Sequence, residues 1–359
     1  MKHVLKHAVI GLSFGLGAFA CAPSENSSAA APGDEPSRYH WTFEDGELFP
    51  ADQSLNRAED GVVLDDGTLL VADQLHGLVA LSADGSHRPF GNFAAAGYRY
   101  EPPALNAGPN GVALTPDRKH VLVADIFTGA IYRTDIEAGT TELIYSHEFG
   151  ANTAEADSTG AIWFTQSTEN NGPDSEARMF AAADRPLSDG ALYRLAPGAD
   201  KAELKISGLD FGNGIVIDEA RGQIYVAETV GSRINAFKAS FDTGELSDRR
   251  VLAEVMTPDN IELDDDGMVW AASPFGNAIF IINPDTGETY SAFHPQTEAG
   301  DAVIAEYHRR NEANEPMGSL FGPDMWAPMP GLVTGIILSP DGGPVYISGL
   351  ATALVKLER

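Results

Sequence analysis

Cysteine and basic residues are both scarce in this sequence. Cys21 is the only cysteine among 359 residues, so the chain can form no internal disulfide. Lysine and arginine number 23 against 52 aspartates and glutamates, which gives a formal net charge of −29. Because binding to a phosphate backbone needs a basic face, this charge argues against a nucleic acid partner, while it is compatible with binding a cation.

A run long enough to span a membrane is missing from the N-terminus. The apolar stretch from Ala8 to Ala20 follows Lys2 and Lys6 and is too short for a transmembrane helix, so residues 1–20 are predicted to be an export signal. Residues 21–40 are small, polar and proline-bearing, a composition typical of a flexible tether that cannot bury a core.

Cleavage of that signal before Cys21 would make this cysteine the mature N-terminus. The arrangement resembles a bacterial lipoprotein signal, although Ala18 stands where such signals usually carry leucine. Ala18-Phe19-Ala20 also fits ordinary signal cleavage. We expect an outer-membrane lipoprotein that faces the periplasm and contacts the membrane only through lipidated Cys21; the alternative is a soluble periplasmic or secreted protein.

Six segments repeat one pattern of two short apolar strands around a tight turn. The frequent glycine (37) and proline (22) favour such strand-and-turn structure. The segments are "EDGVVLDDGTLLVAD" from Glu59, "NGVALTPDRKHVLVAD" from Asn110, "NTAEADSTGAIWFTQ" from Asn152, "NGIVIDEARGQIYVAE" from Asn213, "DNIELDDDGMVWAAS" from Asp259 and "TGIILSPDGGPVYIS" from Thr334. A further strand, such as "GLVALS" or "AIFIINP", follows most copies. Four strands in roughly 40–50 residues is the period of a propeller blade. The sequence therefore predicts an all-β, six-bladed propeller of four-stranded blades over residues 41–359, with a short helical insertion near the last blade.

The first residue of each repeat carries the chemistry. Five of the six have a carboxylate or amide oxygen: Glu59, Asn110, Asn152, Asn213 and Asp259, with Thr334 as the sixth. Equivalent positions of successive blades form a ring around the central axis, and oxygen ligands of this number and type suit Ca²⁺. No histidine or cysteine joins the ring, which argues against zinc. The alternative is that these side chains only cap turns.

The acidic triplet Asp264, Asp265 and Asp266 is a different case. It stands where the other copies have "LDDG", "SPDG" or "STG", so it is predicted to be a turn between two strands without a role in chemistry.

The repeats resemble those of six-bladed calcium-dependent hydrolases. "FGNGIVIDEARGQIYVAET" and "PDNIELDDDGMVWAAS" are similar to the fourth- and fifth-blade motifs of paraoxonases, of the senescence-marker-protein/gluconolactonase group and of strictosidine-synthase-like proteins. The likeness is best over residues 55–290. It implies one catalytic Ca²⁺ that polarises a carbonyl or phosphoryl oxygen. The implied metal ligands are Glu59, Asn152, Asn213, Asp259 and Asn260.

The sequence also departs from these families. Asn110 replaces the catalytic histidine of paraoxonases, and Gly150 replaces an arginine of the sugar lactonases. The second, structural calcium of paraoxonases uses an acid where this chain has Thr153, so Asp60 keeps only one ligand of that site. Glu59 and Asp259 together argue against the condensation chemistry of strictosidine synthases proper.

Two insertions are expected to cover the channel mouth. One spans residues 167–190 and the other 293–331, where Ala302, Ile304, Ala305 and Tyr307 form a partial apolar stripe. Phe321, Met325, Trp326 and Met329 follow. The insertions are either a plug packed on the propeller or a lid that selects the apolar part of a substrate.

We expect hydrolysis of a small-molecule ester or lactone at the channel mouth. Asp259 is the candidate base or nucleophile, and Asn152 and Asn213 would orient the reacting oxygen. Asn110, which together with Asn260 would complete the metal shell, and Trp326 are candidate substrate contacts. The alternatives are a non-catalytic binding or scaffold propeller and one whose metal is only structural.

Overall fold

The structure is a computed structural model, and it describes residues 39–359. The predicted signal, Cys21 and most of the predicted tether lie outside the described residues. The packed chain begins by Tyr39, whose ring stacks on Trp41 with 4.4 Å between the centroids. No helix of the described residues has the length and apolar character that crossing a membrane would require.

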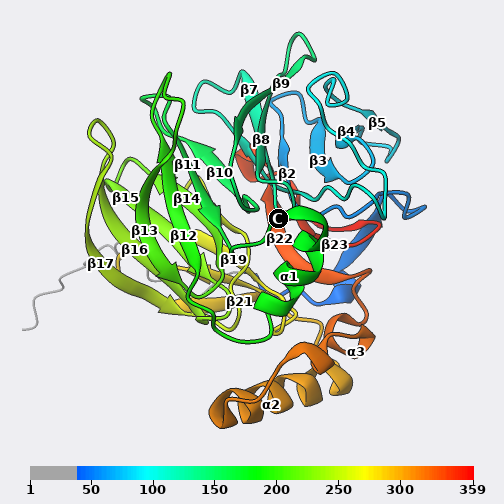
Figure 1. The fold of residues 1–359 in the computed structure, drawn as a ribbon. Coiled ribbons are helices and arrows are strands. Elements are labelled where there is room, and N and C mark those ends of the chain that lie inside the picture. The colour runs from blue at the N-terminus through cyan, green and yellow to red at the C-terminus, as the bar shows by residue number, and fades with distance from the viewer. Residues whose placement is uncertain (1–38) are drawn as a thin grey trace, which may run out of the picture. The chain divides into compact units, whose positions relative to one another are not determined.

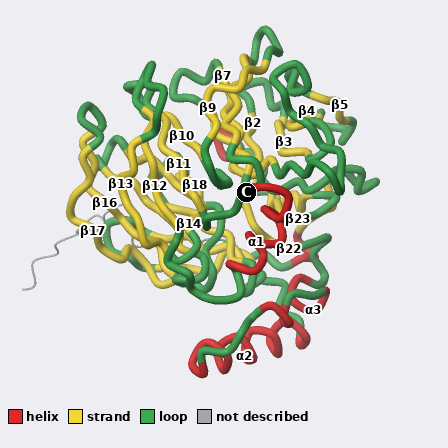
Figure 2. Tube along the Cα trace, in the orientation of Figure 1, coloured by secondary structure: helices red, strands yellow, loops and turns green. Residues whose placement is uncertain are grey.

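The described chain forms six four-stranded antiparallel sheets, which confirms the predicted six-bladed propeller. In Figure 1 the sheets fan around a common centre, and Figure 2 shows that strands dominate. The strands of each blade are given from the first strand outwards, and blade 1 contains β2 (Gly61–Val63), β3 (Leu69–Asp73), β4 (Gly77–Leu81) and β5 (His87–Pro89). Blade 2 contains β6 (Pro109–Leu114), β7 (His120–Asp125), β8 (Ala130–Asp135) and β9 (Thr141–Ser146). Blade 3 contains β10 (Ala154–Ala156), β11 (Ile162–Gln166), β12 (Gly190–Leu195) and β13 (Glu203–Leu209). Blade 4 contains β14 (Gly212–Asp218), β15 (Gln223–Glu228), β16 (Arg233–Ser240) and β17 (Glu245–Glu254); blade 5 contains β18 (Ile261–Leu263), β19 (Val269–Ser273), β20 (Ala278–Ile282) and β21 (Thr289–Phe293).

Blade 6 is assembled from both ends of the described chain. Its inner strands are β22 (Leu332–Leu338), β23 (Val345–Leu350) and β24 (Leu354–Leu357), and its outermost strand is β1 (Gly46–Phe49). β1 pairs antiparallel with β24, with Gly46 opposite Leu357 and Phe49 opposite Leu354. This pairing closes the ring.

The core lies between neighbouring blades rather than at the axis. Successive side chains of a strand point to opposite faces of its sheet, so each blade packs against the blade on either side. In β3, Leu70 and Ala72 join the apolar cluster with blade 2, whereas Leu69 and Val71 join the cluster with blade 6. Six such clusters, one for each pair of neighbours, are present. Burial on both faces explains why consecutive residues of a second strand, such as Leu69, Leu70, Val71 and Ala72 of β3, are apolar.

The helices lie in the predicted insertions and at the ends of the described chain. They are α1 (Ser175–Ala182), α2 (Glu298–Ala313) and α3 (Pro323–Trp326), with the 3₁₀ turns η1 (Phe43–Asp45), η2 (Gly172–Asp174), η3 (Gly318–Leu320) and η4 (Pro340–Gly342). Figure 2 shows α1, α2 and α3 in red on the same side of the ring. In α2 the packed face consists of Val303 and buried Tyr307, whereas Ala302 and Ala305 of the predicted stripe are exposed, because i and i+4 share one face of a helix.

The acidic triplet forms a turn, as predicted. Asp265 and Asp266 are exposed between β18 and β19. Asp264 is structural: its Oδ1 accepts from the backbone N–H of Asp266 and Met268, and its Oδ2 accepts from the Trp270 indole N–H at 2.7 Å. The same device recurs in blade 3, where Asp157 accepts from the Trp163 indole at 2.8 Å.

Candidate active site and metal centre

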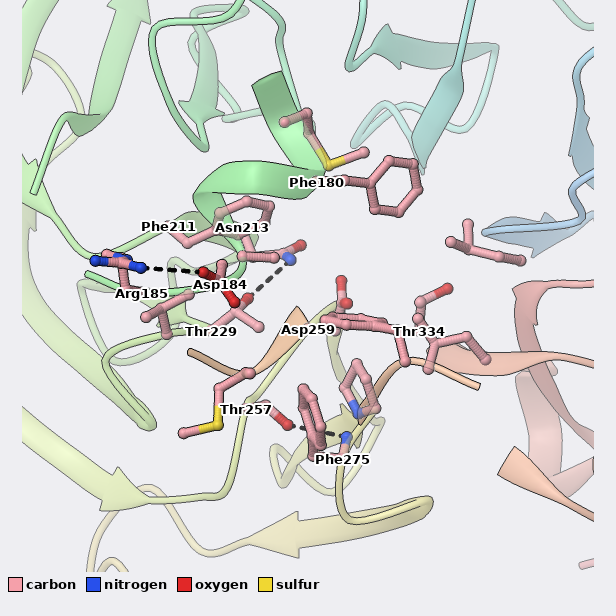
Figure 3. Close-up of a pocket in the computed structure, with 18 of the residues that line it drawn as sticks. Phe180, Asp184, Arg185, Phe211, Asn213, Thr229, Thr257, Asp259, Phe275 and Thr334 are labelled. Atoms are coloured by element: carbon pink, nitrogen blue, oxygen red, sulfur yellow. Dashed lines mark hydrogen bonds and ion pairs between the residues drawn. The ribbon is translucent and has the colours of Figure 1, made fainter. Parts of the chain in front are cut away.

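All six repeat-start residues line one pocket at one end of the channel. They are Glu59, Asn110, Asn152, Asn213, Asp259 and Thr334. Each lies within, or up to two residues before, the first strand of its blade, β2, β6, β10, β14, β18 or β22. The shared repeat phase therefore places the ring correctly, and Figure 3 shows Asn213, Asp259 and Thr334 facing the same space.

Two buried carboxylates share the floor of this pocket. Burial raises the pKa of Glu59 to about 7, partly offset by the positive charge of Arg57 and a hydrogen bond from Asn260. The pKa of Asp259 is raised well above its usual range, first by burial and then by repulsion from Glu59. Holding both groups ionised costs free energy unless a cation lies between them.

Two further oxygens on the same floor have no hydrogen-bond partner. Asn213 Oδ1 and Thr334 Oγ1 are buried and unpaired. The amide of Asn213 is oriented from its other end, since Nδ2 donates to Thr229 Oγ1 at 2.9 Å (Figure 3). Thr229 in turn donates to the Pro258 carbonyl at 2.8 Å. Unpaired buried acceptors indicate that a donor or a metal ion completes this site.

The donor set fits calcium. Glu59, Asp259, Asn213 and Thr334 offer only oxygen, the ligand type that Ca²⁺ prefers, and two carboxylates balance its charge. In the part of the chain that the structure describes, no three side chains of the His, Cys, Asp and Glu types gather as a metal-binding group. The candidate site consists instead of two carboxylates with neutral oxygens.

Asn110 and Asn152 form a hydrogen-bonded chain along one side of the floor. Arg57 donates to Asn110 Oδ1 at 2.9 Å, and Asn110 Nδ2 donates to Asn152 Oδ1 at 3.2 Å. Asn152 Nδ2 donates to Ser167 Oγ at 2.9 Å. The orientation of Asn152 is therefore fixed from both ends.

Asn260 lies behind Glu59. Its Nδ2 is 3.2 Å from each carboxylate oxygen of Glu59, and its Oδ1 accepts from the Thr153 hydroxyl at 3.1 Å. In this arrangement Asn260 orients Glu59. The prediction that it is itself a metal ligand stays a prediction.

Asp60 does not line the pocket, although it is adjacent to Glu59. Its Oδ2 accepts from the Val112 backbone N–H at 2.8 Å, while its buried Oδ1 has no partner. Glu155 and Glu262 line a hollow next to blade strands β2, β6, β14 and β22. Burial raises the pKa of Glu155 to about 7, and burial followed by the charges of Asp60 and Glu155 raises that of Glu262. Sequence reasoning missed these two glutamates, although both follow a repeat start by three residues.

The walls and roof of the pocket are largely apolar, and charged residues such as Asp184, Arg185 and Glu315 stand at its rim. The walls and roof enclose about 910 Å³, open mouth included, and the two insertions supply Met179 and Phe180 on one side and Tyr307, Met317 and Phe321 on the other. The expectation that both insertions cover the channel mouth is confirmed. Phe211 and Phe275 also line the pocket and were not foreseen.

Trp326 lies outside this pocket. It lines a neighbouring hollow with Phe180, Phe321 and Leu332. Its proposed contact with substrate would therefore require a ligand that extends beyond the main pocket.

Comparisons with known proteins agree with this fold. The family model of the SMP-30/Gluconolactonase/LRE-like region matches residues 146–296. This match, the regucalcin matches and the six-bladed fold together support the SMP-30/gluconolactonase propeller superfamily. Regucalcins of Oryctolagus cuniculus and Bos taurus are 26% and 27% identical over 116 residues, which is 31% of this chain and 38% of each regucalcin. The match therefore spans well under half the length of those relatives.

Solved structures show that the likeness in fold extends over nearly the whole chain. A gluconolactonase from Xanthomonas campestris has a TM-score of 0.59 at 20% identity, covering 90% of this chain and 95% of that one. A luciferin-regenerating enzyme has a TM-score of 0.55 at 14% identity, covering 87% and 94%. At such identities the likeness shows the shared fold.

The departure from the sugar-lactonase pattern at position 150 has a structural cause. Gly150 approaches blade 2 so closely that an added Cβ would collide with the Ile126 carbonyl and the Asn170 amide oxygen. Its backbone N–H donates to Asn170 Oδ1 at 3.2 Å. Position 150 can therefore carry no arginine in this backbone.

Proposed function

We propose that this protein is a calcium-dependent hydrolase of esters or lactones. The observation that supports this most strongly is the pair of buried carboxylates, Glu59 and Asp259, beside two unpaired oxygens at the floor of an apolar-walled pocket. A non-catalytic scaffold gains nothing from burying such a pair. Membership in the superfamily favours lactonase chemistry.

Calcium, when bound by Glu59, Asp259, Asn213 and Thr334 together with the predicted ligand Asn152, would act as a Lewis acid on the substrate carbonyl. Asp259 would be the base. Asp259 lines the pocket floor beside Glu59 and Asn213, so its carboxylate, kept ionised by the metal, is placed to accept a proton from the attacking water. The water oxygen then bonds to the carbonyl carbon, and the proton on Asp259 passes to the departing alkoxide.

The other residues would position the substrate and exclude solvent. Asn152 and Asn213 are fixed by Ser167 and Thr229, so their oxygens keep one orientation during the reaction. The apolar roof would hold the acyl or aryl part of the substrate and keep bulk water from the carboxylates. A direct attack by Asp259 as nucleophile is the alternative use of the same geometry.

The test combines metal analysis with a substrate panel. We expect calcium in the purified protein, hydrolysis of simple aryl esters or lactones, and loss of both with chelator. Asp259→Asn should lose activity and weaken calcium binding, because affinity depends on the number of charged ligands. Asp265→Asn is the matched control on the exposed turn and should change stability by less than about 0.5 kcal/mol.

Each contrary outcome has a clear meaning. Calcium binding without hydrolysis of any substrate would make the metal structural. If Asp265→Asn strips the metal while Asp259→Asn retains it, the two acidic clusters have been assigned the wrong way round.

Export and lipid anchoring through Cys21 are proposed on the sequence alone. Cys21→Ser should move the protein from membrane fractions into the soluble fraction. A wild-type protein that is already soluble in the periplasm or medium would leave ordinary signal cleavage as the explanation.

A further inference from the structure

Arg57 brings a positive charge to the pocket floor that calcium binding does not require. It lies two residues before Glu59 and lines the same pocket. Its backbone φ is 58°, in the left-handed region that side chains other than glycine rarely adopt. Such a conformation at a site is a reason to ask what the side chain does there.

The guanidinium of Arg57 is held in place but only partly used. It donates to the Pro109 carbonyl at 2.7 Å and to Asn110 Oδ1 at 2.9 Å, and it lies 5.5 Å from the centre of the Phe127 ring. Within residues 39–359, these bonds engage two of its five N–H groups. The remaining donors are available to a ligand in the pocket.

No carboxylate of the described chain pairs directly with Arg57. Its charge acts on Glu59 and Asp259 only at longer range. The acids at the rim have other partners: Asp184 pairs with Arg185 at 3.5 Å, and Glu315 pairs with Arg309 at 2.6 Å.

The charge balance therefore favours an anion. Once a divalent cation offsets the two floor carboxylates, the charge of Arg57 remains, so the floor carries one net positive charge. A positive charge that is partly desolvated and has unused donors binds a carboxylate more strongly than a neutral group.

We propose that Arg57 is a specificity-determining residue that binds the carboxylate of an anionic ester or lactone, whose apolar part lies against Met179, Phe180 and Phe275. The inference rests on the proposed hydrolase function and names its substrate class. In this proposal Arg57, just before the first strand of blade 1, provides the arginine contact to substrate that Gly150, just before blade 3, cannot provide.

Binding can be measured without hydrolysis. The probes are 4-phenylbutyrate and its neutral isostere 4-phenylbutyramide, titrated by calorimetry into the full-length protein in calcium. The wild type should bind the acid roughly tenfold or more tightly than the amide, the effect of one charge-assisted hydrogen-bond pair. Arg57→Gln should remove that preference and change amide binding by less than about threefold.

Two variants complete the design. Arg185→Gln removes the same charge from the rim, where Arg185 is already paired with Asp184, and should keep the preference for the acid. Arg57→Met keeps an unbranched side chain that can reach Phe127, whose ring centre lies 5.5 Å from the guanidinium carbon of Arg57, and it replaces Arg57→Gln if that variant does not fold. Melting temperatures show which variants are folded.

The outcomes separate this inference from the proposed function. Equal wild-type affinity for acid and amide, no binding of either, or a preference that survives the loss of Arg57 would overturn the inference. Hydrolysis of monophenyl succinate is then compared with that of neutral phenyl levulinate. A wild type that hydrolyses both equally well keeps the function and loses the inference; one that binds the acid through Arg57 but hydrolyses neither ester loses the function alone.

Discussion

The stability of the metal-free protein should fall as the pH rises, because of Glu59. Its pKa moves from 4.5 to about 7 on folding, so the folded protein holds this proton more tightly than the unfolded chain. Below about pH 4.5 both states are protonated and nothing is lost; between about 4.5 and 7 the unfolded state releases its proton first, and folding becomes less favourable. At 1.36 kcal/mol per pKa unit, the full loss above pH 7 is about 3 kcal/mol.

Glu59→Gln removes this cost while keeping the shape of the side chain. With an unfolding entropy of about 2.1 cal/mol/K per residue over roughly 320 residues, ~3 kcal/mol corresponds to about 4–5 °C. In chelator at pH 8, the variant should melt at least that far above the wild type, because Asp259 also loses its repulsion from Glu59. Near pH 4.5 the two proteins should melt together.

Calcium should reverse the order. At a thousand times the dissociation constant, a bound ion stabilises the folded state by about 4.1 kcal/mol, which exceeds the ~3 kcal/mol that separates the two proteins in chelator, and the variant loses most of this gain with its ligand. The assay is scanning calorimetry from pH 4.5 to 8, in chelator and in calcium. Glu254→Gln, at an exposed carboxylate, is the control that should follow the wild type. A wild type in chelator that is as stable at pH 8 as Glu59→Gln, and indifferent to calcium, would refute the cation site.

Three further changes test other parts of the structure. Asp264→Ala should lower the free energy of unfolding in denaturant by about 1–3 kcal/mol, because it leaves the Trp270 indole N–H without its acceptor. Asp265→Ala should cost little, and an equal loss in both variants would contradict the structural role assigned to Asp264. Thr334→Val should stabilise the chelated protein by up to about 1 kcal/mol, since it removes an unpaired hydroxyl, yet weaken calcium binding in calorimetry; unchanged affinity would exclude Thr334 from the site. Phe180→Ser, at a side chain 41% exposed, should raise KM for aryl esters several-fold with little change in kcat, and an unchanged KM would remove it from the substrate wall.

The ring of site residues could be predicted because it follows from a repeat. Glu59, Asn213 and Asp259 share one phase of six similar segments, and a propeller places equal phases around one axis. Thr334 shares that phase, but a threonine hydroxyl among carboxylates and amides does not by itself predict a metal ligand. Its unpaired position is visible only once the neighbouring side chains are in place.

The pocket walls could not be predicted in the same way. Phe211 and Phe275 lie in segments between repeats, and no period marks which of these side chains turn inward. The place of Trp326 depends on how the insertion folds back on blade 6. The use of Arg57 depends on a backbone conformation that is unusual for arginine, and Gly150 is informative only when the nearby Ile126 carbonyl is seen.

The pairing of β1 with β24 has a consequence for how the chain folds. The ring closes only when the last strands meet a strand that precedes all the other strands of the described chain, a contact of very large sequence separation. Until then, the flanks of blades 1 and 5 leave Leu69 and Trp270 without their blade 6 neighbours. A ribosome-bound or truncated chain would expose these two apolar flanks to chaperones and to aggregation. Loss of only the segment from Leu354 onwards would therefore release β1, some 300 residues earlier in the chain, and damage two blade interfaces together.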